Sequence, residues 1–155
     1  MATTRATDGG ALPWYVEPTF GQRFTAAAVD GMVLILGAIA LTRVPVSDAG
    51  QRQLVWLVSG LYFVGSIALT GRTLGKRALG LQVRSVRTGG LPGLGAATIR
   101  WAVVVVPSIV SWFVPALGRF DAIVTLLVYL PILQPPYHRG LHDFAAGTVV
   151  VAKVA

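Results

Sequence analysis

Residues 21–42 read GQRFTAAAVDGMVLILGAIALT, a segment in which one acidic residue lies inside an otherwise apolar run. The 19 residues from Phe24 to Thr42 carry a single charged side chain, that of Asp30. At a rise of about 1.5 Å per residue, a helix of this length is about 28 Å long, which is close to the hydrocarbon thickness of a bilayer. The segment therefore predicts a transmembrane helix with a carboxylate in its interior.

The composition of the whole chain also indicates a membrane protein. Of 155 residues, 54% are hydrophobic and 12% are charged, a balance too apolar for a water-soluble domain of this size. The net charge is +7, but no basic run is interleaved with aromatic residues. We therefore expect the positive charge to face the anionic headgroups of a lipid bilayer, and we expect no nucleic-acid partner. The chain has no Cys, which excludes thiolate chemistry, and nothing in it predicts a cofactor.

Three more apolar segments follow the first one. The predicted transmembrane helices cover residues 24–42, 54–70, 98–117 and 120–134. The fourth is short, since about 14 apolar residues reach only about 21 Å, so this segment must stretch, thin the bilayer or form a re-entrant loop. The predicted fold class is an all-α polytopic membrane protein with about four transmembrane helices.

The positive charges predict how these helices are oriented. If the amino terminus is cytoplasmic and four helices span, ten Lys and Arg residues lie inside and three lie outside. Because Lys and Arg concentrate in cytoplasmic loops, this partition predicts that both termini and the loop from Gly71 to Ala97 are cytoplasmic. The inner residues are Arg5, Arg23, Arg72, Lys76, Arg77, Arg84, Arg87, Arg100, Arg139 and Lys153, and the outer residues are Arg43, Arg52 and Arg119.

The first residues of the chain differ from the rest in composition. Residues 1–22 contain several Gly and Pro residues and lack the apolar core of a secretory signal. We interpret them either as a cytoplasmic N-terminal arm, held at the headgroup level by Trp14, Tyr15 and Phe20, or as a disordered tail. Residues 23–155 then form the membrane domain.

Two segments outside the predicted helices have strand character. Apolar and polar residues alternate over residues 81–86, and a β-branched run covers residues 147–153. Neither strand is stable alone, so we predict that they pair as a small two-stranded element on the inner membrane surface.

Asp30 is the residue that most needs an explanation. An aspartate at a helix centre costs about 2.5 to 3.5 kcal/mol to insert, which makes the insertion of this helix marginal unless the carboxylate has a partner. Arg23, which lies two turns earlier on nearly the same face, Arg100 at the start of the third predicted span, and a bound proton are the candidates. The site is either an ion or proton site or a buried hydrogen-bonded pair that fixes helix packing.

A glycine-rich basic turn follows the second predicted span, with the sequence GRTLGKR over residues 71–77. It is one residue shorter than a nucleotide-binding phosphate loop, and no Ser or Thr follows the lysine. We predict instead that Gly75, Lys76 and Arg77 hold a lipid phosphate, or that the turn is simply a positively charged anchor.

The segment after the last predicted span contains His138, Arg139, His142 and Asp143. The spacing of the two histidines is that of metal ligands on one face of a helix. Pro135, Pro136 and Gly140 argue against a regular helix in this segment, so we expect no metal site. No Ser lies in a nucleophile-elbow sequence, and we expect no catalytic residue and no enzyme activity.

Three separated motifs resemble the RDD family of bacterial membrane proteins. They are GQRFTAAAVD over residues 21–30, TGRTLGKRALGLQV over residues 70–83 and GLHDFAAGTVV over residues 140–150. The resemblance covers nearly all of residues 20–152. It implies that Arg23, Asp30 and Asp143 are the arginine and the two aspartates for which the family is named. It also implies a bacterial inner membrane as the location. Because Arg23 and Asp143 lie at cytoplasmic ends of the predicted helices and both belong to this trio, we predict that they pair at the inner surface. From their positions in the sequence, we expect Arg100 and His142 to support the trio.

Two classes of function follow from these observations. The first hypothesis is ion- or proton-coupled transport through a charged core formed by Arg23, Asp30 and Asp143, which would need a homo-oligomer because four short helices enclose little space. The alternative is a structural or assembly subunit that packs against a membrane-protein partner or a lipid headgroup.

Overall fold

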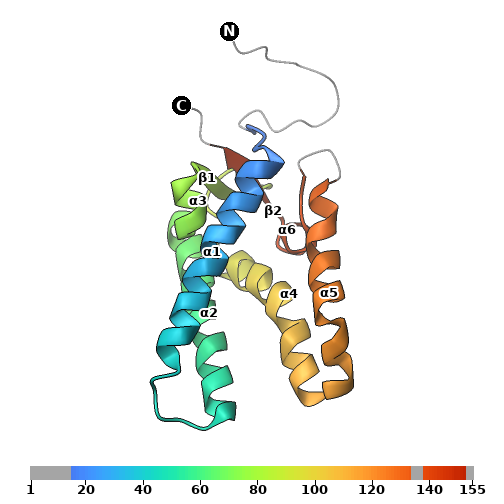
Figure 1. The fold of residues 1–155 in the computed structure, drawn as a ribbon. Coiled ribbons are helices and arrows are strands. Elements are labelled where there is room, and N and C mark those ends of the chain that lie inside the picture. Colours follow the sequence, from blue (N-terminus) through green and yellow to red (C-terminus); the bar gives the residue numbers. More distant parts are fainter. Residues whose placement is uncertain (1–14, 134–137, 153–155) are drawn as a thin grey trace.

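The computed structural model describes residues 15–133 and 138–152, and the prediction that Trp14 is an anchor lies outside them. Two helical hairpins, α1–α2 and α4–α5, extend from one end of the molecule, where α3, the two strands and α6 gather (Figure 1). In chain order the elements are α1 (Phe20–Leu41), α2 (Asp48–Thr70), α3 (Leu74–Ala78), β1 (Leu81–Ser85), α4 (Gly93–Phe113), η1 (Pro115–Phe120), α5 (Asp121–Tyr129), η2 (Leu130–Leu133), α6 (Leu141–Ala145) and β2 (Thr148–Ala152).

Side-chain caps set where the first two helices begin. Thr19 and Gln22 form a capping box that starts α1 at Phe20, so residues 20–22, which we predicted to belong to the arm, form the first helical turn. Ser47 accepts a hydrogen bond from the backbone N–H of Gly50 and starts α2 at Asp48, six residues before the predicted apolar segment. Both helices therefore begin with a polar turn ahead of their apolar part.

Within residues 15–133 and 138–152, three helices are long and apolar enough to cross a membrane, namely α1, α2 and α4. The third begins at Gly93 and ends at Phe113, earlier than the predicted range of 98–117. The fourth predicted span, residues 120–134, is not one long helix: α5 has nine residues and lies between the 3₁₀ turns η1 and η2. Proline lacks a backbone N–H, and Pro131 interrupts the α-helical bonding pattern after Tyr129. The α5 segment still returns the chain alongside α4 (Figure 1).

The predicted two-stranded element is confirmed. Strands β1 and β2 pair antiparallel, with Val83 opposite Val150 at the centre of the ladder. Leu81 and Val83 are fully buried on one face of β1, which is the alternation that the sequence showed. The backbone carbonyl of Val16 accepts a hydrogen bond from the N–H of Ala152 at 2.9 Å, which fastens the start of the described chain to β2.

The apolar core is small and lies next to this sheet. Its buried members are Ala26, Ile67, Leu81, Val83, Ala97 and Val150. The long helices instead expose large apolar side chains along their outer faces, including Phe24, Ile35, Leu57, Leu61 and Phe113. An apolar surface of this extent needs an apolar environment, and lipid provides it for helices of this length.

The short helix α3 packs closely against α1 because it contains a glycine at the contact. A Cβ atom on Gly75 would lie 2.1 Å from the carbonyl oxygen of Ala26, which is backbone and cannot rotate away. This contact brings α3 onto the face of α1 that carries Asp30.

We predict that Gly75→Ala lowers the stability of the protein in detergent by about 1 to 3 kcal/mol or more, because α3 must move away from α1. Gly31→Ala is the matched control, since a Cβ there meets no atom within 4 Å, and removing a helical glycine is neutral or favourable. Thermal unfolding followed by tryptophan fluorescence measures both. Equal melting temperatures for the two variants would contradict the close contact.

Candidate functional site

Asp30 is buried between three elements that satisfy its carboxylate. Its side chain is on α1 and is 2% exposed. The hydroxyl of Tyr62 on α2 donates a hydrogen bond to Oδ1 at 2.7 Å, and the hydroxyl of Thr73 donates to Oδ2 at 2.5 Å. The backbone N–H of Gly75 donates to Oδ1 at 2.8 Å. Three donors to a carboxylate largely offset the cost of removing it from water.

The cation beside Asp30 is Lys76, whose Nζ lies 3.6 Å from Oδ2. The prediction that Arg23 or Arg100 is the partner of Asp30 is therefore wrong. Arg23 forms an ion pair with Asp143. The short helix α3 packs against α1, which brings Lys76 next to Asp30. Burial lowers the pKa of Lys76, and the attraction of Asp30 offsets part of this effect.

Asp143 is the second buried carboxylate, and it joins two of the long helices. It is fully buried on α6, where its Oδ2 lies 3.1 Å from Nη2 of Arg23 on α1. Its Oδ1 forms an ion pair with Nη1 of Arg100 on α4. The pairing of Arg23 with Asp143 that the sequence predicted is present, and Arg100 is a second partner of the same carboxylate.

The local structure of α6 fixes where the Asp143 carboxylate lies. Asp143 is in the first turn and accepts a hydrogen bond from the backbone N–H of Gly140 at 3.1 Å. The Arg139 side chain donates to the carbonyl oxygens of Thr148 and Asp143, at 2.9 and 3.1 Å, and lies 4.2 Å from the centroid of the Phe144 ring. The Thr148 hydroxyl accepts a hydrogen bond from Nη1 of Arg100 at 2.5 Å. The start of β2 therefore helps to hold Arg100.

The two carboxylates belong to one electrostatic system. The charge of Lys76 interacts with those of Asp143, Arg100 and Arg23 as well as with that of Asp30. Burial alone would raise the pKa of Asp143, but Arg100, His142 when it is protonated at low pH, and Arg23 lower it below its usual range. With both carboxylates ionised, the cluster of Arg23, Lys76, Arg100, Asp30 and Asp143 holds three positive charges and two negative ones.

His142 lies against this cluster as a neutral side chain. Burial lowers the pKa of His142 to about 4, so the 3.6 Å contact of its Nε2 with Oδ2 of Asp143 is not an ion pair at neutral pH. Its ring packs on Tyr129, with 5.2 Å between the centroids. Its Nδ1 is buried and makes no hydrogen bond within the described part of the chain.

Two further sequence predictions concern this end of the molecule. The lipid-phosphate role of Gly75, Lys76 and Arg77 stays a prediction. The Gly75 N–H and the Lys76 ammonium group both contact Asp30, and of the three residues Arg77 alone is exposed. His138 precedes α6 and contacts Glu17 at 2.7 Å, so it does not share a helix with His142. Across residues 15–133 and 138–152, no three His, Asp or Glu side chains form a group that could hold a metal.

Sequence reasoning missed the neutral hydrogen-bonding residues of the site. Tyr62, Thr73 and Thr148 are common residue types in unremarkable positions, and their roles depend on contacts between residues far apart in the chain. Thr73 carries one local signal, because it precedes a short helix and caps it by accepting a hydrogen bond from the Lys76 N–H at 3.4 Å.

Comparison with known proteins gives one match. A family model described as RDD family matches residues 17–147, which include every residue of the charged cluster. No curated protein and no solved structure matches the chain.

We predict that stability falls as the pH is lowered from about 6.5 towards about 4, and that His142→Gln removes this part of the pH dependence. The pKa of His142 is about 4 in the folded protein against 6.5 as its ordinary value. Between these values the unfolded chain binds a proton that the folded chain does not, which costs up to about 3 kcal/mol. Chemical unfolding in detergent across this pH range measures the effect. The same pH dependence in both proteins would show that His142 is not buried in its neutral form.

Proposed function

The chain belongs to the RDD family, and we propose that it is a multi-pass protein of the bacterial inner membrane that couples the movement of a monovalent cation to that of a proton. The proposed exchange site is Asp30 with Lys76. The observation that carries the proposal is the contact of a buried carboxylate on a membrane-spanning helix with a single lysine from outside the spans, at 3.6 Å.

The chemistry of the site suits such an exchange. Lys76 is held less closely than the three hydrogen-bond donors, which lie 2.5 to 2.8 Å from the carboxylate of Asp30. When Lys76 releases a proton, Asp30 is left with an uncompensated negative charge. A monovalent cation can then bind the carboxylate together with the hydroxyl oxygens of Tyr62 and Thr73, because hard cations prefer oxygen ligands. Binding of the cation and protonation of Lys76 would therefore exclude one another.

We propose that both ends of the chain face the cytoplasm. Both helical hairpins start and finish at the end of the molecule that carries α3, the strands and α6 (Figure 1). Arg72, Lys76, Arg77, Arg84 and Arg87 follow one another at this end, which the positive-inside bias assigns to the cytoplasm. The α5 segment would then complete a fourth crossing.

A structural or assembly role is the second candidate. A specific observation supports it: both carboxylates have their hydrogen bonds and ion pairs within the chain, as a buried cluster that only fixes packing would have. In this case the exposed apolar faces of the long helices would contact a membrane-protein partner or a second copy of the chain.

The transport proposal predicts cation-dependent proton movement in vesicles that contain the purified protein and an internal pH-sensitive dye. An inward gradient of Na⁺ or K⁺ should change the internal pH with the wild type, and Asp30→Asn should abolish the change. Lys76→Gln should abolish it too, because it removes the proton carrier while leaving the carboxylate. Asp48→Asn makes the same chemical change as Asp30→Asn at an exposed residue at the start of α2, and it should behave as the wild type.

The folding of each variant is checked by its elution profile and melting temperature in detergent. If folded wild-type protein gives no cation-dependent signal at neutral and mildly alkaline pH, and it purifies with a defined membrane complex, the subunit role replaces transport.

The orientation predicts which single cysteines an impermeant thiol reagent reaches in intact cells. The chain has no Cys, so Val46→Cys, between α1 and α2, and Thr88→Cys, after β1, each provide one reactive site. Both residues are exposed. Val46→Cys should be labelled from outside, whereas Thr88→Cys should react only after the membrane is opened. The opposite pattern would place the charged end outside the cell.

A further inference from the structure

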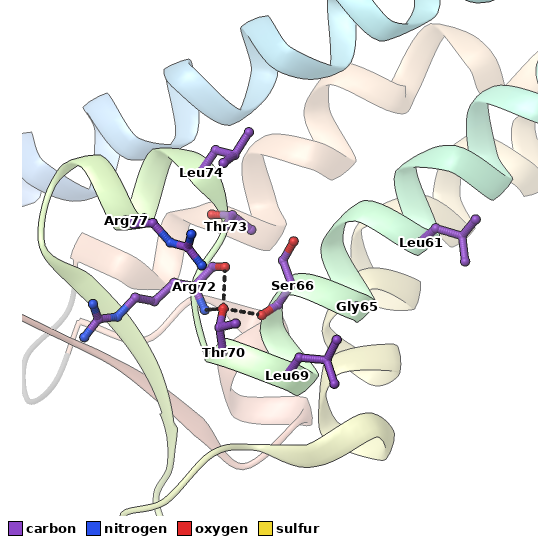
Figure 2. Close-up of a pocket in the computed structure, with 9 residues that line it drawn as sticks. All are labelled: Leu61, Gly65, Ser66, Leu69, Thr70, Arg72, Thr73, Leu74 and Arg77. Carbon is purple, nitrogen blue, oxygen red and sulfur yellow. Dashed lines mark hydrogen bonds between the residues drawn. The ribbon is translucent and has the colours of Figure 1, made fainter.

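A pocket of about 380 Å³ lies where α2 ends and α3 begins. Leu61, Gly65 and Leu69 on α2 line it, and Arg72 and Arg77 line it from the segment that follows. In Figure 2 the two arginine side chains lie on one side of this region, and Leu61 and Leu69 lie on the other. The pocket is therefore amphipathic, with its apolar part along a membrane-spanning helix and its cationic part beyond the end of that helix.

The cationic part of the pocket lacks negative charge. Within the described residues, neither Arg72 nor Arg77 forms an ion pair with a carboxylate, and the same is true of the nearby Arg84. Arg72 and Arg84 both donate to one neutral acceptor, the side-chain oxygen of Gln82, at distances of 3.2 to 3.5 Å. The Nε of Arg72 is buried and makes no hydrogen bond in the described structure. A buried cationic donor without an acceptor is costly. This cost adds to that of the guanidinium charges of Arg72 and Arg77, which an anion in the pocket would neutralise.

The apolar part of the pocket is open to the outside of the helix bundle. Leu61 is 68% exposed and Leu69 is 77% exposed. Gly65 lies between them on the same helix, and a Cβ atom there would meet nothing within 4 Å. A water-soluble anion would leave these leucines uncovered, whereas an acyl chain would cover them.

We propose that this pocket binds one anionic phospholipid, with its phosphate on Arg72 and Arg77 and an acyl chain along Leu61 and Leu69. The proposal is independent of transport at Asp30. The two sites are adjacent, because Thr73 lines the pocket while its hydroxyl donates to Asp30. The lipid would fill the pocket next to α3.

Native mass spectrometry of the purified protein tests the proposal, with phosphatidylglycerol and phosphatidylcholine of identical acyl chains supplied in equal amounts. The wild type should retain one phosphatidylglycerol in preference to phosphatidylcholine. Arg77→Gln should weaken this retention by about fivefold, since one basic residue near an anionic surface contributes about 1 kcal/mol, and the variant with Arg72→Gln added should weaken it further. Gly65→Leu should displace the lipid while keeping both arginines, because Gly65 lines the pocket and a Cβ atom there meets nothing within 4 Å.

Arg87→Gln is the matched control, because it removes the same charge from an exposed residue that does not line the pocket. It should leave retention unchanged. The proposal is overturned if the wild type retains both lipids equally, or if Arg87→Gln weakens retention as much as Arg77→Gln does. Free glycerol phosphate distinguishes a headgroup site from a lipid site: displacement of the lipid by glycerol phosphate at equal concentration would also overturn the proposal.

Discussion

The carboxylate of Asp143 is the anion shared by Arg23 and Arg100, one from each helical hairpin. Two guanidinium groups buried at one end of a membrane protein are tolerable only if a negative charge lies between them, because each unpaired buried charge costs several kcal/mol. The short helix α6 and strand β2 are held in place by the same requirement. They present Asp143 to α1 and α4, and the Thr148 hydroxyl supports Arg100 from the strand. The sheet and the two hairpins therefore meet around a single carboxylate.

Asp30 makes the corresponding arrangement for α2 and α3. The carboxylate contacts a tyrosine from α2, a threonine from the turn into α3, and a backbone N–H and the lysine of α3 itself. A five-residue helix has little stability of its own, so the contact of Gly75 with α1 and the bonds to Asp30 are what keep it folded. The dependence of α3 on Asp30 also suits an exchange site. Because Asp30 holds α3 in place, α3 can shift when the charge of Lys76 changes. Beside this site, Arg72 and Arg77 line the pocket at the end of α2 together with Thr73, and Thr73 links the site to the lipid that we propose there.

The sequence predicted those parts of this arrangement that depend on local pattern. The apolar runs predicted the long helices α1, α2 and α4, and the alternation over residues 81–86 predicted strand β1. The position of Arg23 and Asp143 at the ends of predicted helices suggested their pairing. The partner of Asp30 was not predictable in the same way, because α3 is too short to show helical periodicity and Lys76 reaches Asp30 only through the fold of the turn. Similarly, hydropathy predicted one apolar helix through Pro131. A hydropathy scale does not include the missing backbone N–H of proline, and α5 ends at Tyr129.

The most direct test of this account is a double-mutant cycle between Asp143 and Arg100, measured as free energies of unfolding in detergent. Asp143→Asn should cost about 3 to 5 kcal/mol because it leaves two buried guanidinium groups without their anion. Adding Arg100→Gln to that variant should recover part of the loss, since one of the two unpaired charges is then removed. Asp48→Asn, at an exposed position, should cost little by comparison. Losses that simply add in the double variant, or a loss for Asp143→Asn no larger than for Asp48→Asn, would show that the shared carboxylate does not hold the helices together.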